Sequence, residues 1–68
     1  MAVGTVKWFN ETKGFGFIQP DNGGSDVFVH ISAVERAGLT GLSDNQKVTF
    51  DIVSGRDGRE AAENLQLA

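Results

Sequence analysis

Three phenylalanines and one histidine occupy two neighbouring segments, residues 13–18 and 27–31, in a pattern that suits a planar ligand. Aromatic rings can stack on flat groups such as nucleic-acid bases. Both segments alternate in the manner of β-strands, and the Asp-Asn-Gly-Gly cluster at 21–24 is typical of a turn between them. The sequence therefore predicts a hairpin that carries Phe15, Phe17, Phe28 and His30.

The alternation also predicts which way these rings point. Val27, Val29 and Ile31 share one face of the second strand and already make a sufficient core stripe. Phe28 and His30 are then expected on the opposite face, toward solvent. Phenylalanines in strands are usually core residues, but here the inward face is already occupied. An exposed apolar patch of this size usually has a partner.

A third aromatic contribution comes from the segment at residues 3–10, which is rich in β-forming residues. Its alternation is imperfect, because Val6 and Trp8 share one parity and Phe9 falls on the other. A β-bulge near Trp8 would allow Val6 and Phe9 both to point inward and Trp8 to point outward. We expect Trp8 to join the exposed rings.

The sequence lacks the residue patterns that catalysis or metal binding would require. The chain has no Cys and a single His, so neither zinc-thiolate ligands nor a metal-ligand spacing is present. The sequence fixes no catalytic constellation of Ser, Cys or carboxylate groups around His30. We predict a protein that is not an enzyme and uses no metal, cofactor or small-molecule substrate.

The net charge of −3 and the isoelectric point near 4.8 argue against binding that depends on phosphate contacts. Lys7 and Lys13 nevertheless flank the aromatic segments, and most acidic residues lie elsewhere. A ligand held mainly by stacking tolerates a negative total charge.

The intervening residues predict the elements that position the rings. Residues 10–14 are a tight connection, and Pro20 ends the strand that begins near Phe15. Ser32 and Glu35 have the spacing of a capping box, and Gly38 is placed to end one helical turn. Residues 39–45 read as a loop.

The C-terminal third predicts two more strands. In residues 46–53 we expect Val48, Phe50 and Ile52 to point inward. Residues 54–58 have hairpin chemistry through an Asp-Gly pair. Residues 59–68 favour a helix by propensity, but Ala61, Glu63, Leu65 and Leu67 share a strand face and a small sheet needs its edge covered. We predict a strand.

Together these elements predict an all-β fold, a closed antiparallel barrel of five short strands with one helical turn between strands three and four. Residues 1–68 are expected to form one domain, and the chain carries no leader or apolar run long enough for a membrane span. We expect a complete, monomeric cytoplasmic protein without membrane contact.

The motifs Lys13-Gly14-Phe15-Gly16-Phe17-Ile18 and Val27-Phe28-Val29-His30-Ile31 resemble the two RNA-binding motifs of bacterial cold-shock proteins. Residues 6–10, Ser32-Ala33 and Gly55 also fit, so the resemblance covers essentially the whole chain. It implies an oligonucleotide-binding (OB) barrel that binds single-stranded RNA or DNA and melts RNA secondary structure as an RNA chaperone. It also implies roles in transcription antitermination, translation support and adaptation to cold, stress or growth.

The resemblance further implies which residues contact the nucleic acid. The base-stacking positions of the family fall on Trp8, Phe15, Phe17, Phe28 and His30, and its polar contacts fall on Lys7, Asn10, Lys13 and Arg56. Ile31 and Leu39 stand where the family usually has aromatic residues. Aliphatic side chains pack on a base but lack a flat π-face, so we expect a shorter or weaker binding strip. A protein partner on the same aromatic surface is the alternative.

Overall fold

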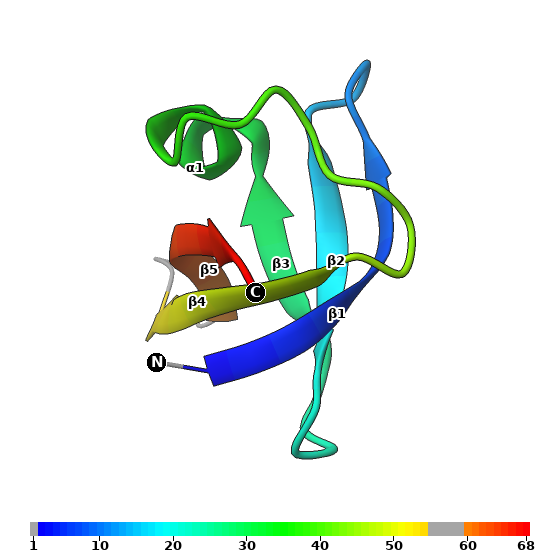
Figure 1. Ribbon diagram of the computed structural model, residues 1–68, viewed down its shortest axis with the longest axis vertical. Coiled ribbons are helices and arrows are strands. Elements are labelled where there is room, and N and C mark those ends of the chain that lie inside the picture. The colour runs from blue at the N-terminus through cyan, green and yellow to red at the C-terminus, as the bar shows by residue number, and fades with distance from the viewer. Residues whose placement is uncertain (1, 55–59) are drawn as a thin grey trace.

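The computed structural model describes residues 2–54 and 60–68. In these residues the chain forms five strands and one short helix (Figure 1). The elements in chain order are β1 (Ala2–Asn10), β2 (Phe15–Pro20), β3 (Val27–His30), α1 (Ile31–Arg36), β4 (Lys47–Ser54) and β5 (Glu60–Leu67). The predicted C-terminal strand is thus confirmed over the described residues, and Pro20 is the last residue of β2. The predicted hairpin turn at 54–58 lies largely outside the described residues.

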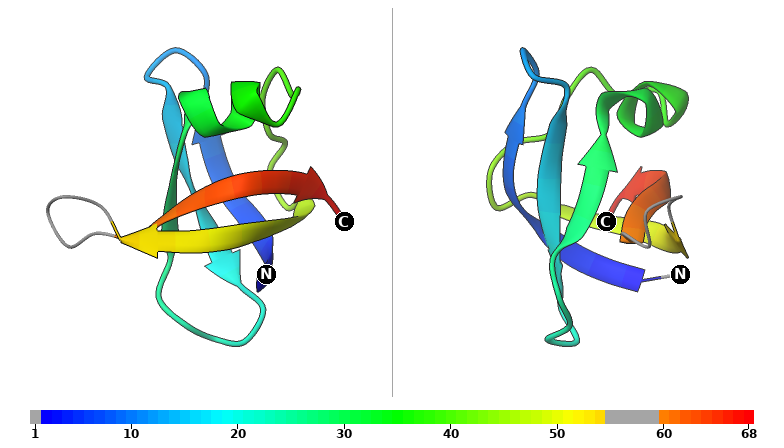
Figure 2. Two further views of the ribbon diagram at one scale, coloured as in Figure 1. Left: turned by 90° about the vertical axis from the view of Figure 1, so that its left-hand side faces the viewer. Right: turned by 180° about the vertical axis from the view of Figure 1, so that it is seen from behind.

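The strands close into a barrel in the order β1-β2-β3-β5-β4, with the β4–β5 pair lying across β1–β3 (Figure 2). This confirms the five-stranded barrel with a helical turn after the third strand. One contact differs from the prediction, since β3 and β5 pair in parallel, at Phe28 and Ala61. A closed ring with an odd number of strands cannot alternate direction all the way round, so at least one neighbouring pair must be parallel.

The predicted bulge in β1 is confirmed. The pairing of β1 with β2 shifts register between Val6 and Trp8. Val6 is fully buried, Phe9 packs against the core, and Trp8 keeps 40% of its surface exposed. The extra residue of a bulge reverses the side-chain alternation, which allows two residues three apart to face inward.

The core consists of eleven buried apolar side chains among the described residues, drawn from all five strands, from α1 and from the loop after it. They are Val6, Ile18, Val27, Val29, Ala33, Val34, Leu42, Val48, Phe50, Ala62 and Leu65. The helix contributes Ala33 and Val34, so α1 closes one end of the barrel (Figure 1).

The inward prediction for Ile52 in β4 was wrong, and β5 does not keep the predicted shared face. Ile52 is 42% exposed, because the pairing of β1 with β4 ends at Ala2 and Phe50, two residues earlier. Leu67 is 55% exposed, and β5 buries Ala62 and Leu65 instead of alternate residues. Ala62 and Leu65 are three residues apart because β5 has an extra residue at Asn64, whose φ is 52° and where the register with β4 shifts. Leu67 follows this irregularity as the last residue of β5.

The end of β3 also differs from the prediction. Ile31 was expected to continue the core stripe of the strand, but β3 ends at His30 and Ile31 begins α1. The N-cap is His30 and not Ser32, so the predicted capping box was placed two residues too late. Gly38 ends the helix as predicted, with a φ of 81° and its N–H donating to the carbonyl of Glu35 over 2.9 Å.

Within the described residues no helix has both the length and the apolar character required to cross a membrane.

Candidate nucleic-acid interface

The β-sheet register brings five aromatic side chains from three adjacent strands to one outer surface. Trp8 of β1 pairs with Phe17 of β2, Phe17 pairs with Phe28 of β3, and Phe15 pairs with His30. Cross-strand partners point to the same face of a sheet. These five residues are called the aromatic cluster below: Trp8, Phe15, Phe17, Phe28 and His30.

The rings of the aromatic cluster contact one another in a continuous series. The Trp8 ring centroid lies 5.6 Å from that of Phe15 and 5.5 Å from that of Phe17, both edge to face. Phe28 is stacked on Phe15 at 5.8 Å and meets Phe17 edge to face at 5.9 Å. The His30 ring follows at 6.3 Å from Phe28. These spacings are typical of favourable aromatic pairs, so the rings support one another at the surface.

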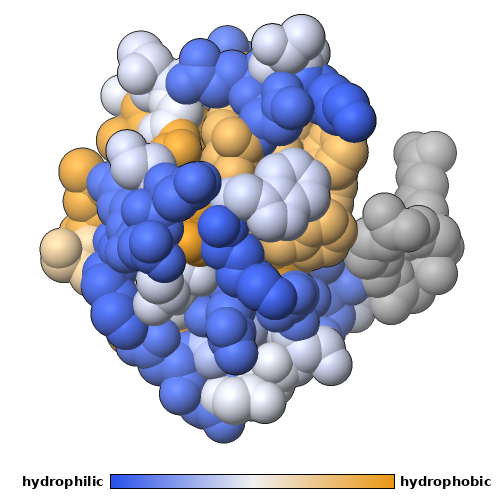
Figure 3. Space-filling model, turned by 90° about the vertical axis from the view of Figure 1, so that its right-hand side faces the viewer, coloured by the Kyte–Doolittle hydropathy of each residue, from blue (hydrophilic) through white to orange (hydrophobic). Residues whose placement is uncertain are grey.

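The phenylalanines of the aromatic cluster are half-buried and not part of the core. On β2 and β3 the core positions belong to Ile18, Val27 and Val29, which are at most 1% exposed. The rings occupy the opposite face, as predicted. Figure 3 looks onto the side of the molecule where β1 and β2 lie, and hydrophilic residues surround most of a hydrophobic area there.

Glycine allows β1 and β2 to approach closely beneath the rings. A Cβ atom on Gly16 would lie 2.7 Å from Cα of Phe9 and 2.8 Å from its ring. Real Cβ atoms do not come so close, so residue 16 must lack a side chain in this arrangement. The partner of Gly16 in the register is Phe9, directly next to Trp8.

The two lysines beside the aromatic cluster differ in their surroundings. Nζ of Lys7 lies 3.1 Å from a carboxylate oxygen of Asp26, with both side chains partly exposed. Lys13 is exposed and forms no ion pair with any residue that the structure describes. Lys13 is therefore directly available to a phosphate, whereas Lys7 must exchange one anionic partner for another.

Asn10 shapes the turn between β1 and β2. Its Oδ1 accepts a hydrogen bond from the backbone N–H of Lys13 over 3.0 Å, and its carbonyl accepts from Gly14 N–H over 2.8 Å. Gly14 has a φ of 81°, which a residue with a side chain rarely adopts. The structure thus gives Asn10 a role in holding Lys13 and Phe15 in place.

The remaining predicted site residues are not brought into the aromatic cluster. Ile31 is half-buried at the start of α1, where its N–H donates to the carbonyl of Gly14 over 2.8 Å. Leu39 is partly buried and packs against the core. Arg56 lies outside the described residues.

Two residues at this surface were not identified as site residues from the sequence. Asp26 pairs with Lys7 across 19 positions of chain, which no local pattern reveals. Ser32 was predicted to be a helix cap and fitted the family resemblance, but it was given no role at the site. In the structure its N–H donates to Nδ1 of His30 over 3.1 Å, and its Oγ lies 3.0 Å from the same nitrogen.

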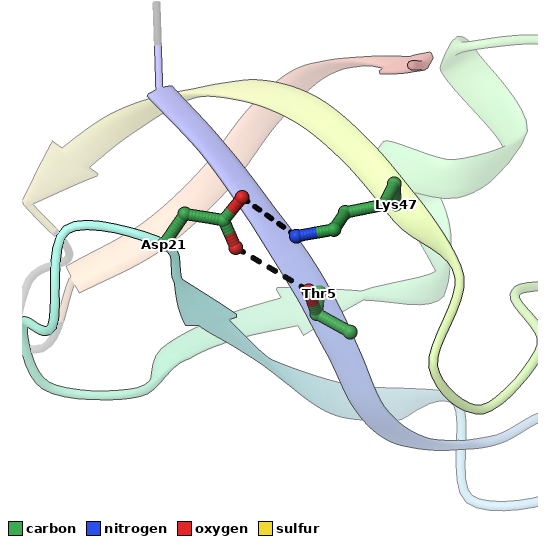
Figure 4. Close-up of polar contacts among 3 residues, drawn as sticks. All are labelled: Thr5, Asp21 and Lys47. Atoms are coloured by element: carbon green, nitrogen blue, oxygen red, sulfur yellow. Dashed lines mark hydrogen bonds and ion pairs between the residues drawn. The ribbon is translucent and has the colours of Figure 1, made fainter.

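A second ion pair joins three strand regions of the barrel (Figure 4). Nζ of Lys47 lies 2.7 Å from a carboxylate oxygen of Asp21, and the Thr5 hydroxyl donates to the other oxygen over 3.3 Å. The hydrogen bond from Lys47 lowers the pKa of Asp21 below its usual 3.8. The Lys47 side chain is therefore already ion-paired with Asp21.

A small closed five-stranded barrel with aromatic rings on its outer surface and lysines beside them is typical of an oligonucleotide-binding (OB) barrel. The family model described as "'Cold-shock' DNA-binding domain" matches residues 2–68, and the chain belongs to this family.

Curated relatives carry the same family name. "Probable cold shock protein y4cH" of Sinorhizobium fredii is 67% identical over 67 residues, which cover 97% of each chain. "Cold shock protein CspA" of Rhizobium meliloti is 64% identical over the full length of both chains. "Cold shock-like protein CspE" of Escherichia coli is 52% identical over 64 residues, covering 94% of this chain and 93% of the relative.

Proposed function

We propose that this protein binds single-stranded RNA and DNA through the aromatic cluster and acts as an RNA chaperone. The observation that carries the proposal is a set of mutually packed rings on the outer face of β1–β3, where soluble proteins usually place polar residues. Each ring that stacks on a base contributes about 1–3 kcal/mol. All four bases have a π-face, so the base preference is mild.

The mechanism requires no bond to be made or broken and no energy source. Bases in a duplex are already stacked on one another and cannot stack on protein rings. The protein binds only the unpaired state and shifts the equilibrium toward it, as any ligand does that prefers one of two states. In a cell this activity would serve antitermination or translation support during cold, stress or growth adaptation.

Electrostatic contacts play a secondary part in this proposal. The net charge is −3, and Lys7 is already paired with Asp26. With three or four cationic contacts, including Lys13 and Arg56, we expect the logarithm of the binding constant to fall with the logarithm of salt concentration with a slope of about −2 to −3.

We further propose that the protein is a monomeric, single-domain cytoplasmic protein without enzymatic activity.

Fluorescence titration of Trp8 tests this function, because Trp8 is the only tryptophan and belongs to the aromatic cluster. An oligothymidine should quench its emission, and a duplex of equal length should not. The titration is repeated at two salt concentrations to measure the slope. Absence of quenching, or equal binding of the duplex, would contradict the proposal. Association with a protein that survives nuclease treatment would instead favour a peptide-binding role for the same surface.

A further inference from the structure

His30 stands at the junction between the aromatic cluster and helix α1. It is the last residue of β3 and the N-cap of α1, with an extended backbone at φ −96° and ψ 151°. Its ring is 6.3 Å from that of Phe28, while its Nδ1 accepts the hydrogen bond from Ser32 N–H. The His30 side chain therefore belongs both to the aromatic cluster and to the N-cap of α1.

Histidine is not among the preferred N-cap residues, which are Ser, Thr, Asp and Asn. Here its Nδ1 is bonded to Cγ, as Oδ1 is in asparagine, so it can reach the N–H of the second helical residue in the same way. Because Nδ1 accepts this hydrogen bond, the neutral ring carries its hydrogen on Nε2. Oγ of Ser32, 3.0 Å away, lies beside the same nitrogen.

We propose that the cap to Ser32 holds the imidazole in the orientation in which it extends the aromatic cluster. Ser32 is then a positioning residue, and the Nε2–H of His30 is the donor offered to a base or phosphate oxygen. The start of α1 and the last ring of the binding surface depend on the same nitrogen atom. This inference rests on the proposed function, because it assigns how one residue of that surface is held.

Two substitutions separate the two roles of His30. His30→Asn retains an N-cap acceptor at the same position but removes the ring. Its melting temperature (Tm) and the protection of the Ser32 amide from hydrogen exchange should match the wild type, while oligothymidine binding weakens about tenfold. His30→Phe retains a ring but has no acceptor. Its Tm should fall by about 4–8 °C and the Ser32 amide should exchange faster. Oligothymidine binding should also weaken, because the ring is no longer held by the cap and has no Nε2–H to donate.

A third variant and a spectroscopic measurement complete the test. Ser32→Ala keeps the backbone donor, so its Ser32-position amide should stay protected and its Tm close to that of the wild type. Long-range ¹H–¹⁵N NMR of the neutral wild-type ring should show Nδ1 without hydrogen and Nε2 with it. The opposite tautomer, or a His30→Phe variant with unchanged Tm and amide protection, would overturn the inference.

The failure of this inference can be distinguished from failure of the proposed function. If wild-type protein does not bind the oligothymidine, the proposed function is wrong. If wild-type protein binds and both His30 variants lose the same stability and the same affinity, only the division of roles between cap and ring is wrong.

Discussion

At the scale of single residues, the side chains of the aromatic cluster pack against one another while remaining partly exposed to solvent. Phe15, Phe17 and Phe28 are half-buried and pack against each other, and Phe15 and Phe17 also pack against Trp8. They lie on the outer face of the sheet, opposite the core positions of β2 and β3. Their side chains can therefore be removed at little cost to the fold but at large cost to a ligand that stacks on them.

We predict that Phe15→Ala and Phe28→Ala each weaken oligothymidine binding by about 1–3 kcal/mol and lower the free energy of unfolding by about 1 kcal/mol. Phe50→Ala is the matched control. Phe50 is fully buried, so its truncation should cost about 3–5 kcal/mol of stability. Fluorescence titration and urea unfolding measure the two quantities. If the Phe15 and Phe28 variants lost as much stability as Phe50→Ala, the prediction would be wrong and these rings would act as core residues.

At the scale of elements, β1 and β2 form the part of the barrel that brings Trp8 next to Phe15 and Phe17. The bulge between Val6 and Trp8 turns the indole outward, and Gly16 allows the two backbones to approach. Neither feature touches a ligand in the proposed mode of binding. Both determine where the tryptophan ring lies.

Gly16→Ala should therefore destabilise the barrel by about 1–3 kcal/mol, the usual cost of forcing atoms into a well-packed site. It should also displace Trp8, which a shift of its emission spectrum in the absence of ligand would report. Gly24→Ala is a suitable control, because a Cβ there meets only Asn22 Oδ1, at 3.3 Å in the exposed turn. Equal stability of the two variants would show that the close approach of β1 and β2 is not required.

At the scale of the whole molecule, the barrel is held closed by strand pairing around the ring and by side chains that connect distant segments. Asp21, after β2, joins β1 through Thr5 and β4 through Lys47. The lowered pKa of Asp21 means that the folded state favours its charged form. This contribution to stability is present above the ordinary pKa of 3.8 and is lost as pH falls through the lower pKa of the folded state.

The corresponding prediction is a pH-dependent difference between wild type and Asp21→Asn. At neutral pH the variant should have a slightly lower Tm, because the ion pair with Lys47 is exposed and its contribution is small. The difference should disappear in strong acid. Asp44→Asn is the control, since Asp44 is exposed and forms no hydrogen bond or ion pair within residues 2–54 and 60–68. A difference that stays constant from neutral pH to strong acid would contradict the role of the charged carboxylate.

Local sequence patterns were sufficient for much of the fold and of the site. The alternation in β2 and β3 placed Phe28 outward, the crowding in β1 predicted the bulge at Trp8, and Gly38 marked the end of α1. These features depend on residues within a few positions of one another. Their steric requirements can be read without knowing which strand lies alongside.

Other features depended on the tertiary structure, because they are set by segments that are distant in sequence. Ile52 has an inward pattern but lies beyond the end of its pairing with β1, and Asn64 interrupts the alternation of β5 where that strand meets β4. The partner of Lys7 is 19 positions away. The sequence by itself determined that aromatic rings would face outward. Only the tertiary structure decided which rings contact one another, because those contacts depend on the register of β1 with β2 and of β2 with β3.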